Sequence, residues 1–289
     1  MLDVLLDTLL DTVKILPFLF LTYLLIEYLE HKAGEKIEGV IQRSGKLGPF
    51  FGGLLGVVPQ CGFSTAASSL YSGRVITMGT LLAVFLSTSD EMLPIMISSR
   101  AKPTLILTIL GVKLLIGVLF GFLIDLLYSL IRGKNSSSEL HIEDICEQEH
   151  CHCEKGILRS ALHHTLHIVL FLFLITFAIN TAIYFLGEDL LASFILNKPV
   201  LGSLLAGLFG LIPNCAASVV ITQLFLNGLI SGGAMLSGLL SSAGVGILVL
   251  FRVNHHWKEN CLILSILYVT SILPGIVFDV TGLAPLLFR

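Results

Sequence analysis

Two stretches of this 289-residue chain repeat one another at a spacing of 154 residues. Residues 47–88 align with residues 201–242 without a gap, and 14 of the 42 positions are identical. The match centres on a break made of a proline, an amide and a cysteine, which reads Pro59-Gln60-Cys61 in one copy and Pro213-Asn214-Cys215 in the other. A duplication of this kind predicts a fold made of two similar halves.

Both copies lie in sequence that is far more apolar than an ordinary soluble domain. The chain is 55% hydrophobic and 13% charged, whereas soluble domains are about one-quarter charged. The apolar residues come in blocks long enough to cross a lipid bilayer, which predicts an all-α polytopic membrane protein. No basic cluster with interleaved aromatic residues is present, so nucleic acid is not an expected partner. A homo-oligomer in the membrane is compatible with this composition.

The repeated breaks divide their apolar segments into arms that are too short to cross the membrane alone. Each arm of residues 47–73 and 200–227 has roughly 12 residues, or about 18 Å of helix, against a hydrocarbon core of about 30 Å. The next segment, residues 76–99, is interrupted in turn by Ser87-Thr88-Ser89-Asp90-Glu91. We therefore expect two inverted-topology repeats, each with a re-entrant helical hairpin and a second broken helix.

The distribution of Lys and Arg indicates how the hairpin runs. If residues 47–73 turn back within the membrane, one side of the protein carries 11 of these residues and the other carries 5. If the segment crosses once, the split is 9 to 7. The positive-inside rule favours the hairpin, with both termini outside the cell. The predicted domains of this plasma-membrane protein are a first membrane repeat (1–131), a cytosolic linker (132–160) and a second membrane repeat (161–289).

The two hairpin tips are the first part of a candidate binding site. Entering from opposite sides, they would meet near the midplane, where transporters built from inverted repeats hold their cargo. Gln60 and Asn214 can pair with freed backbone groups or bind a substrate. Cys61 and Cys215 are either thiol ligands or small buried hydrophobic residues.

The hydroxyl and carboxyl groups beside the breaks are the second part. Asp90 and Glu91 are adjacent carboxylates inside an apolar segment, and such residues mark ion or proton pathways. The preceding hydroxyl groups add oxygen ligands of the kind that hard divalent cations favour. The alternative is that residues 88–92 form a solvent-exposed loop. The second copy has no acid at the equivalent place, so one half supplies the charge, and Lys113 could neutralise a carboxylate in the empty site.

Ser64 and Ser218, three residues after the cysteines, could face the site or bond back to their own helices. No catalytic residue is expected. The candidate substrate- or ion-binding residues are Gln60, Cys61, Ser64, Ser87, Ser89, Asp90, Glu91, Asn214, Cys215, Ser218 and Ser241.

The linker between the halves is rich in cysteine, histidine and carboxylate groups. Such a tract favours zinc, nickel or copper, although its spacing is not that of a structural zinc finger. The alternative is a flexible acidic linker. No cofactor is expected for transport itself, and the candidate ligands of this peripheral metal are Cys146, His150, Cys151, His152 and Cys153.

The run from Pro59 to Ser64, followed by the run from Gly79 to Glu91, resembles the ten-transmembrane heavy-metal exporters. These are relatives of the organoarsenical permeases and are also described as manganese or arsenic efflux proteins. The resemblance implies a secondary active transporter that exports a divalent metal, manganese or another heavy metal, through a midplane site, and no enzyme. Two alternatives are a permease for arsenicals or other thiophilic compounds, with Cys61 and Cys215 as ligands, and an intramembrane lipid diphosphate phosphatase. The phosphatase would need cationic groups to hold phosphate, and neither hairpin tip carries one.

Overall fold

The computed structural model describes residues 47–59, 61–89, 91–132 and 199–284, with single positions between 8 and 24 and between 162 and 181. This described part is helical and contains no strand. The helices of the first half are α3 (Gly48–Gly56), α4 (Cys61–Ser72), α5 (Met78–Ser87), α6 (Met92–Ser98) and α7 (Pro103–Arg132). Those of the second half are α11 (Pro199–Gly210), α12 (Cys215–Leu226), α13 (Gly232–Ser241), α14 (Gly246–Val253) and α15 (Trp257–Val280). The starts of α12 to α15 lie 154 residues after those of α4 to α7 (215 − 61, 232 − 78, 246 − 92 and 257 − 103), so the duplication is structural as well as sequential.

Matching polar caps start the two equivalent helices α5 and α13. The Thr77 hydroxyl oxygen accepts a hydrogen bond from the Thr80 amide at 3.1 Å, and the Ser231 oxygen accepts one from the Ala234 amide at the same distance. The caps satisfy a backbone donor that has no partner within the first turn of a helix. Both helices therefore begin at a hydroxyl residue that the two copies share.

A carboxylate from the long helix of each half fixes these helix starts. Asp125 of α7 accepts hydrogen bonds from the Gly79 amide at 2.8 Å and from the Thr77 hydroxyl at 2.7 Å. Asp279 of α15 makes the same two bonds to the start of α13, at 2.9 and 2.6 Å. A negative charge at a helix N-terminus is stabilising. These two aspartates therefore bind each broken helix to the long helix of its own half.

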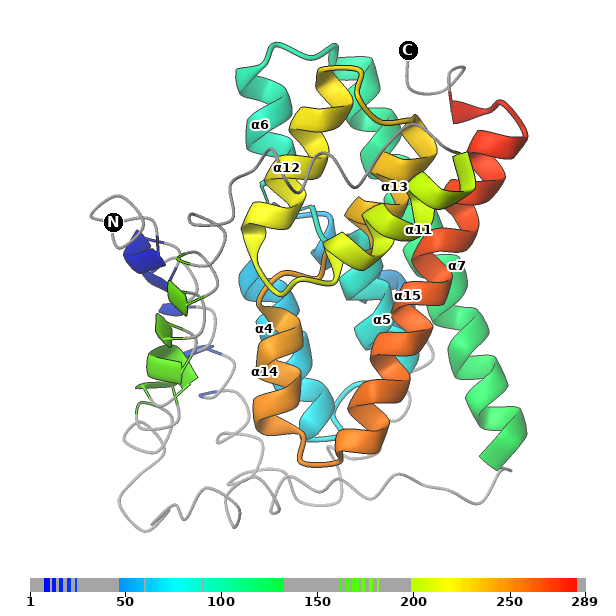
Figure 1. The fold of residues 1–289 in the computed structure, drawn as a ribbon. Coiled ribbons are helices and arrows are strands. Elements are labelled where there is room, and N and C mark those ends of the chain that lie inside the picture. The colour runs from blue at the N-terminus through cyan, green and yellow to red at the C-terminus, as the bar shows by residue number, and fades with distance from the viewer. Residues whose placement is uncertain are drawn as a thin grey trace, which may run out of the picture.

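The halves interlock at both ends of the molecule. Figure 1 shows α4 beside α14 at one end and α6 near α12 at the other, and both pairs pack across the halves. The long helices α7 and α15 run in opposite directions along the side of the molecule. The interruptions between the short helices lie near mid-height of the view. The polar breaks are thereby collected in the middle of the protein.

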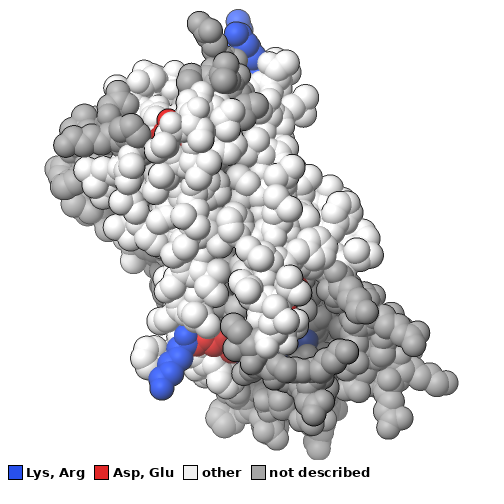
Figure 2. Space-filling model, turned by 90° about the vertical axis from the view of Figure 1, so that its right-hand side faces the viewer, with Lys and Arg blue, Asp and Glu red and all other residues white. Residues whose placement is uncertain are grey.

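The chain is a polytopic membrane protein. Four helical stretches of the described part are long and apolar enough to cross a bilayer: 78–98, 103–130, 232–253 and 257–280. The two broken stretches lie inside, with 71% and 89% of their apolar windows buried, whereas only 28% and 33% of the windows of α7 and α15 are buried. Figure 2 shows an almost uncharged surface between two ends that carry Lys and Arg. The long helices therefore present the lipid-facing surface.

The last helix begins before the last apolar segment of the sequence does. The hydrophobic segment starts at position 261, but α15 begins at Trp257 and ends at Val280. Its first turn contains the charged residues Lys258 and Glu259, which are helical although they precede the apolar segment. This polar turn forms part of the contact between the halves described below.

Candidate functional site

The tip of the first hairpin lies against the break of the second broken helix. α4 begins at Cys61, immediately after the break, and its first turn faces the start of α14. A Cβ atom added to Gly246 would lie 2.8 Å from the Ser64 Cβ, so a glycine is needed for this approach. The buried Ser68 hydroxyl donates to the Gly246 carbonyl at 2.7 Å. A tip from one half therefore packs directly on a helix break of the other half.

The repeated cysteines share one buried cluster. Cys61 and Cys215 are each the first residue of a helix, and both belong to a cluster that includes Val245 and Val249. Their exposed fractions are 8% and 7%, and neither forms a disulfide in the described part of the chain. Although the two cysteines are 154 residues apart in sequence, the fold brings them into the same apolar neighbourhood.

The candidate serines are buried and bond to their own segments. The hydroxyl groups of Ser64, Ser87, Ser89, Ser218 and Ser241 each donate to a carbonyl oxygen two to four residues earlier, at 2.7 to 3.2 Å. Of the two alternatives for Ser64 and Ser218, the structure therefore has the bond back to the helix. A hydroxyl oxygen whose proton is used in this way keeps lone pairs that can accept a hydrogen bond or contact a cation.

The remaining candidates are placed only in part. Asn214 is buried, and its Oδ1 accepts from the Ala216 amide at 3.2 Å, so it caps α12. Glu91 is half-buried at the start of α6. Among the residues that the structure describes, no three His, Cys, Asp or Glu side chains are grouped to hold a metal. The candidates outside the described residues are Gln60, Asp90, Cys146, His150, Cys151, His152 and Cys153.

Lys113 connects the two helix breaks at the centre of the protein. Its side chain is 1% exposed, and its Nζ donates to the Thr88 carbonyl and, at 2.9 Å, to the Leu239 carbonyl. These carbonyls belong to the C-terminal ends of α5 and α13, where backbone acceptors lack partners within the helix. Leu267 occupies the equivalent position in the second half and is also fully buried. The sequence suggested only that Lys113 could balance a carboxylate, because its contact with the other half depends on distances across the fold.

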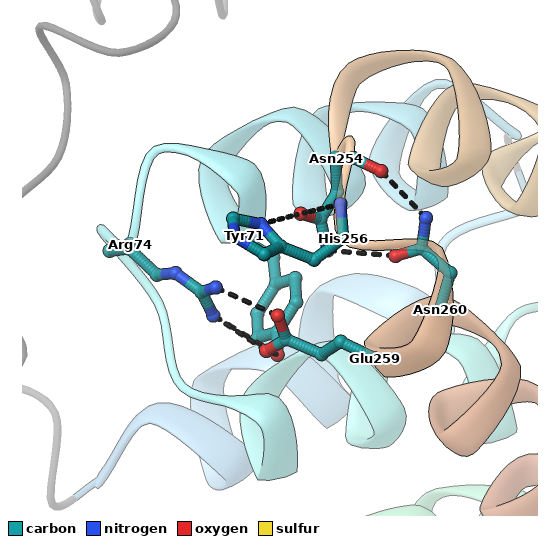
Figure 3. Close-up of polar contacts among 6 residues, drawn as sticks. All are labelled: Tyr71, Arg74, Asn254, His256, Glu259 and Asn260. Atoms are coloured by element: carbon teal, nitrogen blue, oxygen red, sulfur yellow. Dashed lines mark hydrogen bonds and ion pairs between the residues drawn. The ribbon is translucent and has the colours of Figure 1, made fainter.

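An ion pair joins the halves at one end of the molecule. Both terminal nitrogens of Arg74 donate to the Glu259 carboxylate, at 2.7 and 2.8 Å, and the Tyr71 hydroxyl also donates to Glu259 (Figure 3). The Arg74 guanidinium lies 5.3 Å from the centre of the Tyr71 ring. Hydrogen bonding to Glu259 raises the pKa of Arg74 above its ordinary value. A bidentate pair of this kind fixes the geometry as well as the distance between the end of α4 and the start of α15.

The turn before α15 is ordered by a second set of polar contacts. The Asn254 side-chain amide donates to the Asn260 Oδ1 at 2.7 Å, and the Asn260 amide donates back to the Asn254 carbonyl at the same distance. The His256 Nδ1 lies 3.2 Å from the Asn254 Oδ1 (Figure 3). These bonds hold the first turn of α15 in place and thereby position Glu259.

This contact between the halves was not predicted from the sequence. The positions equivalent to Tyr71, Arg74 and Glu259, at an offset of 154, are Phe225, Gly228 and Leu105. A position-by-position comparison of the two copies could have indicated it, because Arg74 and Glu259 are charged whereas their equivalents, Gly228 and Leu105, are not. The equivalent positions at the other end therefore cannot form an ion pair of this kind.

Comparisons with known proteins identify the family of the chain. Neither the comparison with curated proteins nor the comparison with solved structures gave a match. A family model described as "Putative, 10TM heavy-metal exporter" matches residues 1–198, which include the first hairpin, the first broken helix and the linker. This match confirms the resemblance noted from the hairpin motif, and the second half repeats the first helix by helix. The chain belongs to this family of ten-transmembrane heavy-metal exporters.

Proposed function

We propose that the protein is a secondary active transporter that exports a divalent metal cation, manganese or another heavy metal. The carrying observation is that the hairpin tip of one half packs on the helix break of the other half, in an interior formed by the broken helices. Membership of the exporter family supports heavy-metal efflux as the general activity. We assign no catalytic step to the chain.

We further propose that the two repeats have inverted topology. The opposite directions of α7 and α15 support this proposal. The positions of the two aspartate contacts also support it. The Asp125 contact lies next to the loop that carries Arg74, and Arg74 binds Glu259 at the start of α15. Asp279 lies 20 residues further along α15, about 30 Å away, so the two aspartate contacts lie at opposite ends of the protein. The positive-inside rule then favours the cytosol for the end that carries Arg74, and with it for the linker of residues 132–160.

The ligands proposed for the metal are oxygen atoms beside the break of the first broken helix. Asp90 and Glu91 would supply carboxylates, and Ser87 and Ser89 would supply hydroxyl oxygens, which suits a hard divalent cation. The burial of Ser89 and Thr88, at 1% and 3% exposed, supports an interior path for the chain here over a solvent-exposed loop. A carboxylate in such a place favours a cation as cargo.

Transport into proteoliposomes tests the metal proposal. Purified protein is reconstituted, and uptake of Mn²⁺, Zn²⁺, Ni²⁺ and arsenite is measured with and without a pH gradient. We expect uptake of a divalent cation that Asp90→Asn lowers by about tenfold or more, since about 1.4 kcal/mol of lost binding corresponds to a factor of ten. Gly111→Ala is the matched control, because nothing lies within 4 Å of a Cβ added there. Wild-type uptake by Asp90→Asn would contradict the proposal.

One observation favours a second candidate, a permease for arsenicals or other thiophilic compounds. Cys61 and Cys215 lie in one buried cluster and form no disulfide in the described part of the chain, and thiolates favour soft metals and metalloids. The double variant Cys61→Ser/Cys215→Ser separates the candidates in the same assay. The second candidate is supported if the wild type takes up arsenite but no divalent cation and the double variant loses the arsenite uptake. The first candidate is supported if the double variant still takes up a divalent cation.

A further inference from the structure

Two helices from different halves direct their carbonyl ends at one point in the protein. α5 and α13 both end at a break, and the last carbonyls of a helix carry partial negative charge and lack partners within the helix. The Ala243 amide donates to the backbone carbonyl of Ser241 at 2.9 Å, so it does not donate to the Leu239 carbonyl four residues earlier, as it would in a continuous helix. The carbonyls of Leu239 and Thr88 instead both accept from one ammonium group. Helix C-terminal ends that converge at an interruption are the type of ligand set that binds small cations in transporters.

The group that occupies this point is a cation that the chain itself supplies. The Lys113 ammonium has three donors and no acceptor, and its side chain is 1% exposed. A buried charge is stable only when it is paired and hydrogen-bonded. The negative ends of two helices, with both carbonyls accepting, meet part of that requirement. The second half has Leu267 at the equivalent position, so the Lys113 ammonium of the first half contacts the breaks of both halves.

The packing of α7 on α5 holds Lys113 at this position. A Cβ added to Gly117, one turn further along α7, would lie 3.0 Å from the Ala83 carbonyl, so the two helices are close enough for the lysine to reach the end of α5. The hydroxyl of Ser242, at the end of α13, is buried and lacks a hydrogen-bond partner within the described part of the chain. Ser242 is three residues from Leu239, so a further oxygen atom is present at the same helix end.

We propose that the ends of α5 and α13 form a monovalent-cation site and that the Lys113 ammonium occupies it as a tethered cation. The wild-type protein then needs no free Na⁺ or K⁺ to hold the two breaks together. Shortening the side chain should open the site to a free cation from solution. The inference does not rest on the metal that is transported, because it concerns the stability of the central contact.

Thermal unfolding of the purified full chain in detergent tests the proposal. Lys113→Ala removes the ammonium and leaves space, whereas Lys113→Met fills most of the space without charge. Each protein is heated in choline chloride, sodium chloride or methylammonium chloride at equal ionic strength. We expect Lys113→Ala to unfold at a lower temperature than wild type in choline. In methylammonium or sodium its Tm should rise by about 3 °C or more, increasing with concentration. Wild type and Lys113→Met should not respond.

The opposite outcomes are equally clear. A Tm of Lys113→Ala that is the same in all three salts, or a rise of the same size in wild type, overturns the cation site and leaves Lys113 as a structural donor alone. If Lys113→Ala gives no folded protein in choline, it is purified in methylammonium and exchanged into choline, and a loss of folded protein after exchange supports the proposal. Lys113→Gln, which keeps a donor without charge, is a second variant, and a Tm in choline equal to that of wild type would show that the charge is not the property that matters.

Discussion

Arg74 and Gly228 are equivalent residues with the same unusual backbone conformation. Their φ angles are 57° and 71°, in the left-handed region that favours glycine. Each follows a helix whose last turn is closed by the same backbone hydrogen bond. The Val75 amide donates to the Leu70 carbonyl at 2.9 Å, and the Leu229 amide donates to the Leu224 carbonyl at the same distance. For a residue other than glycine this conformation costs roughly 1–2 kcal/mol. The first copy keeps an arginine there, and its ion pair with Glu259 offsets the strain.

Substitution of Arg74 separates the strain from the ion pair. Arg74→Ala and Arg74→Gly both remove the contact with Glu259, but only alanine keeps the left-handed strain. We expect both to lower stability, because a partly buried carboxylate loses its partner, and alanine to be worse than glycine by about 1 kcal/mol. The measurement is thermal unfolding in detergent. Gly228→Ala is the control and should lower stability by a similar 1 kcal/mol; equal stability of the two Arg74 variants would argue against backbone strain at this position.

At the scale of the element, glycine pairs set how closely each broken helix approaches its long helix. A Cβ on Gly79 of α5 would overlap the Gly121 carbonyl oxygen of α7, and a Cβ on Gly233 of α13 would overlap the Gly275 carbonyl oxygen of α15. The same contact occurs at the same offset in both halves. These glycines are required by close backbone approach, which also brings Asp125 within hydrogen-bond distance of the start of α5.

Alanine substitutions at two glycines should therefore differ sharply. Gly79→Ala places a methyl group against backbone atoms that cannot move independently, so we expect a loss of about 2 kcal/mol or more and a low yield of folded protein. Gly111→Ala, on the open side of α7, should be neutral or stabilising by about 0.5–1 kcal/mol because alanine favours the helix. Yield and Tm after size-exclusion chromatography measure both. A folded Gly79→Ala with the Tm of wild type would show that α5 and α7 can separate without cost.

At the scale of the whole molecule, the two ends differ although the halves have the same helices. One end is held by the ion pair between Arg74 and Glu259, whereas the equivalent positions at the other end are uncharged. In a transporter that works by alternating access, the interactions between the halves at one end must break. The ion pair between Arg74 and Glu259 is a contact that such an opening at the charged end would have to break.

Labelling of Cys61 tests which end is held closed. In a variant with Cys61 as its only cysteine, Glu259→Gln removes the carboxylate charge and should weaken the contact between α4 and α15. We expect the rate of reaction with a membrane-impermeant maleimide to rise several-fold from the Arg74 side of the membrane and to stay unchanged from the other side. Gly111→Ala in the same background is the control. An unchanged rate from both sides would mean that the ion pair does not restrict access to the hairpin tip.

Much of the fold could be predicted from the sequence, because the determining features are local. A proline lacks a backbone donor, and together with the amide residue that follows it in both copies it predicts the break before Cys61 and the break before Cys215. A proline alone is not sufficient, since α15 continues through Pro274. Long apolar segments are helical in lipid, since no water is present to satisfy the backbone. The duplication, the membrane class and the membership of the exporter family could be read from the chain in this way.

The candidate site could be predicted only in outline. The sequence indicated that the hairpin tips carry polar groups and that the charge comes from one half. Whether Ser64 and Ser218 bond to their own helices or face the site depended on side-chain rotamers, which no pattern in the chain encodes. The polar first turn of α15 was missed because an apolar window detects the hydrocarbon span and not the end of a helix.

The tertiary structure alone decided which residues meet across the halves. Lys113 reaches a carbonyl 126 residues away, and Arg74 reaches a carboxylate 185 residues away. A hydrogen bond forms only within about 3 Å, and that distance depends on how two separately encoded halves pack. The sequence by itself determined two similar broken halves in a membrane; packing decided that one lysine contacts both breaks and that an ion pair joins the halves between Arg74 and Glu259.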